Sequence, residues 1–189
     1  MKFLNYFGDF WSYLKKDSWD SWLVSLILIL VLIKLVFFPL LSLVTGSPLP
    51  LVVIESCSMY HSSDFEGWWE SNGLWYEKNG ITMDEFKKFK FKDGLNKGDV
   101  VLVLGKSNPL IGDVIIFNAN YKYPLIHRLV TWKPLGTKGD HNFNQLRDER
   151  SIKQGQVLGK AVARVPAVGW LKLIFFEWTK PKEQRGFCK

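Results

Sequence analysis

One long apolar run near the N-terminus constrains this chain more than any other feature of its sequence. From Trp22 to Val44 it reads WLVSLILILVLIKLVFFPLLSLV, in which 19 of 23 residues are apolar. A helix of that length spans about 34 Å, enough to cross a hydrocarbon layer of about 30 Å. The run is longer than the apolar stretch of about 7–15 residues in a cleaved signal peptide. We therefore expect a retained transmembrane anchor over residues 21–44.

The basic residues around this run predict its orientation. Lys2, Lys15 and Lys16 precede the run, and no Lys or Arg follows it until Lys78. Cytoplasmic flanks of membrane helices carry an excess of Lys and Arg, so we expect a cytoplasmic N-terminus and an extracytoplasmic main domain. Residues 1–20 alternate between aromatic and polar side chains, which predicts a short amphipathic helix at the cytoplasmic interface.

The charge and the cysteine content exclude several classes of protein. The formal net charge is +7, and all of this excess lies in residues 61–189, because residues 1–60 carry four basic and four acidic side chains. A basic domain held outside the cytoplasm favours membrane lipids as a partner. Nucleic-acid binding is not expected, since no motif supports it. Two cysteines, Cys57 and Cys188, are too few for a disulfide scaffold or a four-thiolate zinc site.

The main domain, residues 45–189, has the pattern of a mainly β fold. Its short apolar runs are rich in β-branched residues and are bounded by Gly, Pro or Asn, and they lie at residues 51–59, 99–105, 113–119, 125–132 and 157–165. Such runs at short spacing are typical of a sheet without alternating βαβ units. Thr82, followed three residues later by Glu85, predicts the capping box of a short helix.

Residues 61–98 form an aromatic insertion in this domain. Its aromatic side chains are Phe65, Trp68, Trp69, Trp75 and Tyr76. Two interpretations of these side chains stay open. Trp and Tyr favour the lipid interface, so these residues could form a rim that contacts the membrane. They could equally form the core of a small subdomain.

A serine-rich segment follows the first apolar run of the main domain. Ser56, Cys57 and Ser58 precede Met59, and a serine hydroxyl needs a neighbouring base to act as a nucleophile. In a regular strand Cys57 would point away from the side shared by the two serines. We therefore expect Cys57 to be packed and not nucleophilic.

The chain has three histidines, of which one is the best candidate for a base. His127 lies within the predicted strand 125–132, which would hold its ring more rigidly than a loop. His61 is three residues from Ser58, and an extended chain would place it about 10 Å away, so we expect a surface histidine there. His141 belongs to the segment TKGDHN.

Four short motifs give the chain a family resemblance. SCSM, GDVIIF, HR and TKGDHN follow one N-terminal span in this order. In these motifs and their order the chain resembles type I signal peptidases. More narrowly, it resembles the archaeal and endoplasmic-reticulum branch, in which a histidine stands at the position of the lysine of bacterial members. The resemblance covers about residues 20–60 and 97–170. It implies a signal-peptidase-like β domain with one N-terminal transmembrane helix and a short insertion.

The resemblance assigns roles to particular residues. It implies that Ser58 is the nucleophile and His127 the general base, while Ser56 and the Ser58 backbone N–H form the oxyanion hole. Asp140 matches one of two acidic positions of the family. Gln145 and Leu146 stand where the second is expected, and Asp148 is the nearest acid, so the third catalytic residue stays open between Asp140 and Asp148. The family usually has a proline two residues after the methionine, whereas Tyr60-His61 follows Met59 here.

These roles predict a membrane-anchored serine endopeptidase that removes signal peptides from exported preproteins. The mechanism requires no metal or organic cofactor. The predicted partners are preproteins and membrane lipids, while other subunits and the secretion channel stay open. Two alternatives remain: a catalytically silent relative that binds or scaffolds, and a serine protease of other membrane precursors.

Overall fold

The computed structural model describes residues 2–189, with side chains from residue 8 onward, so expectations for the Lys2 side chain lie outside the described part. The chain divides into two compact units, Met1–Val44 and Thr45–Lys189. The second unit carries every residue predicted to act in catalysis.

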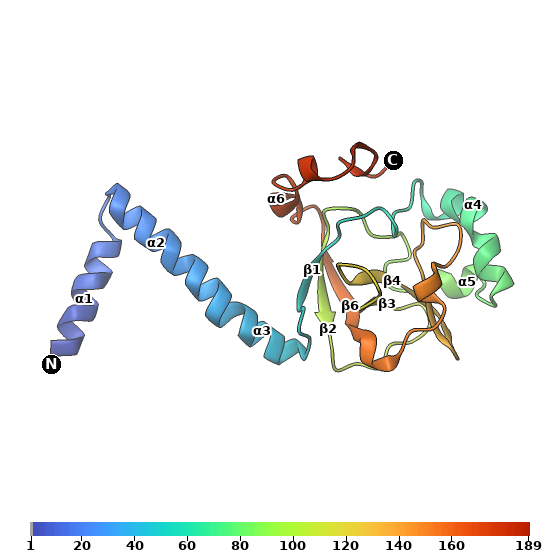
Figure 1. Cartoon of the computed structure of the whole chain (residues 1–189), viewed down its shortest axis with the longest axis horizontal. Helices are drawn as coiled ribbons and strands as arrows, with labels where there is room; N and C mark the ends of the chain where they lie inside the picture. Colours follow the sequence, from blue (N-terminus) through green and yellow to red (C-terminus); the bar gives the residue numbers. More distant parts are fainter. Residues whose placement is uncertain (1) are drawn as a thin grey trace. The chain divides into compact units, whose positions relative to one another are not determined.

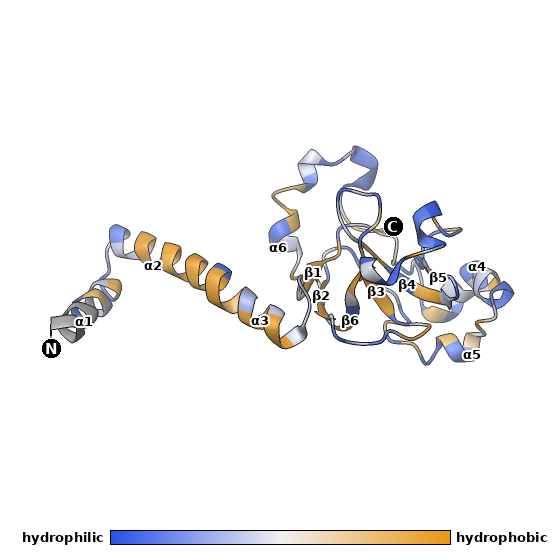
Figure 2. Cartoon of the chain, turned by 60° about the horizontal axis from the view of Figure 1, so that its bottom comes forward, coloured by the Kyte–Doolittle hydropathy of each residue, from blue (hydrophilic) through white to orange (hydrophobic). Residues whose placement is uncertain are grey.

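The first unit is helical. It contains α1 (Lys2–Leu14) and a longer helix made of α2 (Trp19–Leu32), the π-helical turn η1 (Ile33–Phe37) and α3 (Phe38–Thr45). Within residues 2–189 one helix, Trp19–Thr45, is long and apolar enough to cross a membrane, and Figure 2 shows its almost continuous apolar colour. The wide turn η1 ends two residues before Pro39, whose missing N–H cannot complete the regular helical ladder.

The second unit is built on one six-stranded antiparallel sheet that forms a half-barrel (Figure 1). Its strand order is β1-β2-β6-β3-β4-β5. The strands are β1 (Leu51–Val53), β2 (Val100–Leu104), β3 (Val114–Phe117), β4 (Leu125–Trp132), β5 (Leu135–Lys138) and β6 (Val157–Val165). Each of the five predicted runs contains a strand, whereas β5 was not expected.

The apolar core occupies both faces of the central strands. Every side chain of β3 is buried, with Val114 and Ile116 in one cluster and Ile115 and Phe117 in another. This alternation follows from the two-residue period of a strand. A strand that is apolar on both faces lies inside the domain, and β3 is accordingly paired with β6 on one side and with β4 on the other.

The insertion folds as a helical subdomain and makes the unit mixed α/β, not mainly β. It contains α4 (Phe65–Lys78) and α5 (Met83–Phe86), and the Thr82–Glu85 capping box is confirmed. Trp68, Tyr76 and Phe86 are at most 1% exposed. The core interpretation is therefore confirmed, and a membrane-contacting rim is wrong for the buried aromatic residues Phe65, Trp68, Trp69 and Tyr76.

Short helical turns complete the loops and the C-terminal segment. They are η2 (Arg147–Glu149), η3 (Gln154–Gln156), α6 (Trp170–Leu173), η4 (Glu177–Thr179) and η5 (Lys182–Gln184). A disulfide joins Cys57 to Cys188, with a Cα–Cα distance of 5.6 Å. Nζ of Lys97 also lies 2.6 Å from Oε2 of Glu177. The C-terminal segment is thus attached to the serine-rich segment 56–58.

The disulfide corrects the expectation that Cys57 is simply packed. Disulfides persist in oxidising compartments and are rare in the cytosol. Together with the apolar helix Trp19–Thr45, the Cys57–Cys188 bond indicates a membrane or secretory location.

Candidate active site

Ser58 lies in a turn and not in a regular strand. The strand β1 ends at Val53, and the N–H of Tyr60 closes the turn on the carbonyl of Cys57 at 3.0 Å. The carbonyl of Ser58 accepts a hydrogen bond from the N–H of His141 at 2.8 Å. Directly after Ser58, the Met59 side chain is fully buried in the core. The turn is therefore fixed on both sides, while the Ser58 side chain remains half-buried.

The structure brings the predicted nucleophile and base together. Nε2 of His127, on β4, lies 2.9 Å from Oγ of Ser58. His127 is 2% exposed, so its ring is held by the surrounding core. Oγ of Ser56 lies 3.1 Å from Oγ of Ser58. The histidine lies on β4, as the sequence predicted, whereas the two serines lie in the turn after β1 and not in the predicted extended run.

A buried glutamate contacts the other nitrogen of the His127 ring. Oε1 of Glu149, in η2, lies 2.5 Å from Nδ1 of His127, although the N–H is not aligned with the oxygen as a hydrogen bond requires. Oε1 also accepts a hydrogen bond from Thr137 Oγ1 at 3.1 Å, and Oε2 accepts one from the Leu146 N–H at 2.6 Å. Glu149 is fully buried, and these contacts hold its carboxylate against the imidazole.

Neither predicted aspartate contacts His127 within residues 2–189. Asp140 instead binds the Arg128 side chain, with Nη2 at 2.6 Å. Oδ2 of Asp148 accepts a bond from the N–H of Asn120 at 3.3 Å. Successive residues of a 3₁₀ turn point about 120° apart, so Asp148 and its neighbour Glu149 cannot face the same ring. The structure therefore corrects the expected acidic partner of His127 from Asp140 or Asp148 to Glu149.

Asp140 is the centre of a buried polar cluster behind the nucleophile. Besides Arg128, it accepts a hydrogen bond from the Tyr76 hydroxyl at 2.8 Å, and Nε2 of His61 lies 3.1 Å away. Burial alone would raise the pKa of the Asp140 carboxyl, but the Arg128 guanidinium and the His61 contact hold that pKa well below its usual range. Asp140 is therefore ionised at neutral pH.

The cluster fixes the segment that binds the nucleophile backbone. Asp140 lies between Gly139 and His141, and the His141 N–H bonds the Ser58 carbonyl. A Cβ on Gly139 would stand 2.8 Å from that same carbonyl, which is too close for a side chain. Asp140 thus acts on Ser58 through backbone position and not through contact with the His127 ring.

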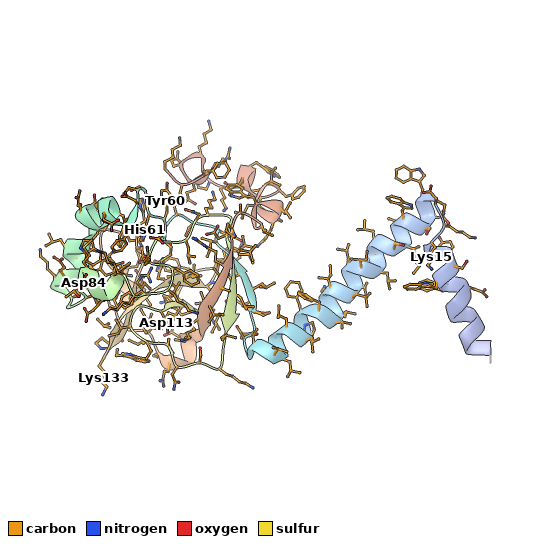
Figure 3. The ribbon with its side chains drawn as sticks, turned by 180° about the vertical axis from the view of Figure 1, so that it is seen from behind. Lys15, Tyr60, His61, Asp84, Asp113 and Lys133 are labelled. Atoms are coloured by element: carbon orange, nitrogen blue, oxygen red, sulfur yellow. A yellow bond between two sulfur atoms is a disulfide. The ribbon has the colours of Figure 1, made fainter. Side chains whose placement is uncertain are left out.

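His61 is buried, which contradicts the expected surface position. Its ring stacks on Trp68 at 3.7 Å between centroids, with the planes 3° apart, and 6% of the residue is exposed. Figure 3 shows Tyr60 and His61 on the side of the sheet domain that carries α4. His61 therefore connects the turn of the nucleophile to the helical insertion.

Two donors near Ser58 are available to a bound oxygen. The backbone N–H of Ser58 donates no hydrogen bond within residues 2–189, and the Ser56 side chain is exposed. Within the same residues no group of three His, Cys, Asp or Glu side chains is arranged to hold a metal ion. The arrangement of hydroxyl, imidazole and buried carboxylate is suited to acyl transfer through a serine nucleophile.

The chain was compared with protein-family models and with curated proteins, and neither comparison finds a match. The chemistry of the site is therefore inferred from its geometry, together with the motif resemblance described above.

Proposed function

We propose that this protein is a membrane-anchored serine endopeptidase that removes signal peptides from exported preproteins. The observation that carries the proposal is the chain of contacts from Ser58 through His127 to Glu149. A serine, a histidine and a carboxylate in this order form the constellation used by many serine hydrolases.

Each residue has a defined role in the proposed mechanism. Nε2 of His127 takes the proton of the Ser58 hydroxyl while Oγ attacks the scissile carbonyl carbon. The buried Glu149 carboxylate stabilises the imidazolium that forms. The Ser56 hydroxyl and the Ser58 N–H donate to the developing oxyanion. His127 then protonates the leaving amine, and a water activated by the same ring hydrolyses the acyl-enzyme and restores Ser58.

The proposed substrate follows from the family resemblance. It is a preprotein with small residues at the first and third positions before the cut. An extended peptide beside a strand presents alternate side chains to the same face, so two shallow pockets would select those positions.

The proposed topology is a single-pass anchor with a cytoplasmic N-terminus and an extracytoplasmic catalytic domain. The Cys57–Cys188 disulfide supports an oxidising location for that domain, and Lys15 and Lys16 before the span support a cytoplasmic N-terminus. In intact cells, external protease should digest Thr45–Lys189 and leave a tag at the N-terminus protected. Protection of the C-terminal domain would contradict this topology.

The activity is tested with the full-length protein in detergent and a preprotein that carries a signal peptide. We expect one product whose new N-terminus follows a small residue, and we expect slower cleavage when that residue is replaced by Phe. Mass spectrometry of the product identifies the cut. Absence of cleavage would favour a catalytically silent relative, and cleavage only of other membrane precursors would favour the second alternative.

A further inference from the structure

A cleft of about 430 Å³ lies between the second half of α4 and the segment that follows β5. One wall comes from the helix, with Asn72 and Trp75, and the other comes from the segment 142–144, with Asn142 and Phe143. None of the side chains of Ser58, His127 and Glu149 lines it. The cleft is therefore distinct from the catalytic contacts.

The cleft begins next to the backbone that holds the nucleophile. The N–H of Asn142 bonds the carbonyl of Gly139 at 2.9 Å, and the N–H of His141 bonds the carbonyl of Ser58 at 2.8 Å. Asn142, in the cleft wall, is thus one residue away from a direct contact with Ser58.

The charged residues of the cleft are cationic. Lys78 and Lys138 line it, no acidic residue does, and within residues 2–189 neither lysine has a carboxylate at ion-pair distance. Lys138 is 1% exposed, with Nζ 3.1 Å from the Gly139 carbonyl and 4.8 Å from the centre of the Tyr76 ring. A buried cation that lacks a carboxylate partner is costly, so an incoming carboxylate would gain a strong partner.

The side chains around Lys138 and in the rest of the cleft indicate which kind of ligand the cleft could bind. Burial lowers the pKa of Lys138 to about 8, although the negative charges of Asp140 and Glu149 act in the opposite direction. Leu74 and Phe143 add apolar surface to the cleft and are 62% and 95% exposed. Amide side chains such as Asn72 and Asn142 offer both donors and acceptors to an extended backbone. Together these features suit a peptide segment better than a small apolar molecule.

We propose that the cleft binds an acidic residue in the substrate segment that follows the scissile bond. The proposal rests on the proposed peptidase function. In such a substrate the first and third positions before the cut carry small side chains, and we therefore assign the carboxylate to the segment after the cut. The cleft would then position the part of the substrate that is released first.

The first test compares matched preproteins that differ in one residue after the cut. Glu or Gln is placed at each of the second to fifth positions, and kcat/KM is measured with the full-length protein. We expect one Glu substrate to be cleaved about tenfold faster than its Gln counterpart, which corresponds to about 1.4 kcal/mol. Lys138→Met and Lys78→Gln should each reduce this ratio toward one. Lys133→Gln, an exposed lysine in the turn after β4, should leave it unchanged.

A second test separates this proposal from the peptidase function. Full-length Ser58→Ala in detergent is titrated with fluorescent ten-residue peptides that carry Glu or Gln, and binding is followed by anisotropy. Tighter binding of the Glu peptide, lost in Ser58→Ala/Lys138→Met and in Ser58→Ala/Lys78→Gln, supports the cleft even if no preprotein is cleaved. Equal binding of both peptides, or a preference that survives both lysine substitutions, overturns it and leaves the peptidase proposal intact.

Discussion

Two adjacent carboxylates in η2 contact different parts of the molecule. Glu149 is fully buried against His127, whereas Asp148 contacts only the Asn120 backbone within the described residues. The pair provides a matched comparison, because both side chains belong to the same turn and differ by one methylene.

Glu149→Gln should reduce kcat for preprotein cleavage by about 10²–10⁴-fold, because a neutral amide does not stabilise the imidazolium of His127. KM should change little, since Glu149 is buried and does not touch the substrate. Asp148→Asn should stay within about twofold of the original protein. An equal loss in both variants, or a loss only in Asp148→Asn, would contradict the role of Glu149.

The charge of Asp140 predicts a pH dependence of stability. Its pKa in the folded protein is held well below the ordinary value, against the effect of burial, by Arg128 and His61. The carboxylate therefore stabilises the fold above about pH 4, and this contribution is lost as the pH falls toward the folded-state pKa. Asp140→Asn should lower the free energy of unfolding at pH 7 by about 3–5 kcal/mol, since it leaves Arg128 buried without its partner.

Urea unfolding in detergent, followed by tryptophan fluorescence at pH 7 and pH 3, measures this effect. The difference in the free energy of unfolding between Asp140→Asn and the original protein should be smaller at pH 3 than at pH 7. A constant difference at both pH values would contradict the ionised state of Asp140. Asp84→Asn is a suitable control, because Asp84 lies in α5 without an ion pair within residues 2–189.

The sequence was sufficient to predict which serine and which histidine meet. The resemblance of four ordered motifs to type I signal peptidases assigned the roles of Ser58 and His127, and Nε2 of His127 lies 2.9 Å from Oγ of Ser58. The sequence was not sufficient to predict the carboxylate that contacts His127, because the choice between Asp148 and Glu149 depends on the rotation of a three-residue turn. That rotation is set by tertiary contacts of Glu149 with Thr137 and the Leu146 N–H, and no local pattern reports them.

The helix α4 is the main helix that the sequence pattern did not predict. Asp64 caps it, with Oδ1 accepting from the Gly67 N–H at 3.0 Å, and its buried aromatics recur at helical spacing. Gly73 obscured this signal because glycine weakens helices. The glycine is needed, since a Cβ there would stand 2.5 Å from the Trp69 ring.

One disulfide attaches the C-terminal segment to the rest of the domain, and the sequence did not predict that this bond forms. Cys57 and Cys188 are 131 residues apart, and only the fold brings them together. Replacing both by Ala should lower the free energy of unfolding by about 2–5 kcal/mol, because the unfolded chain regains the freedom that this long loop removes. Thermal unfolding in detergent, with and without reductant, measures the loss.

The same double variant should keep its activity at 25 °C. The Ser58–His127 contact involves neither sulfur, so we expect preprotein cleavage within about tenfold of the original protein. Limited proteolysis should cut the C-terminal segment sooner in this variant. An unchanged unfolding temperature together with an unchanged proteolysis pattern would contradict a stabilising role of the disulfide.

For the whole molecule, the division into an apolar helix and a sheet domain could be predicted from patterning alone. The apolar run and the strand periodicity are local signals, and β4 and β6 match their predicted runs residue for residue. The strand order, the burial of His61 and the cluster around Asp140 are contacts between distant segments, so local patterns do not encode them. Two of the basic residues that contribute to the net charge of +7, Lys78 and Lys138, lie in the cleft next to α4.

The proposed cleavage of preproteins depends on Ser58, activated by His127. Its most direct test is the rate of preprotein cleavage in detergent by Ser58→Ala, with Ser62→Ala as a matched control because Ser62 is exposed. We expect Ser58→Ala to lose at least about 10³-fold in kcat and His127→Ala a similar factor, while Ser62→Ala cleaves normally. Cleavage by Ser58→Ala at the rate of the original protein would contradict the role of Ser58 as the nucleophile.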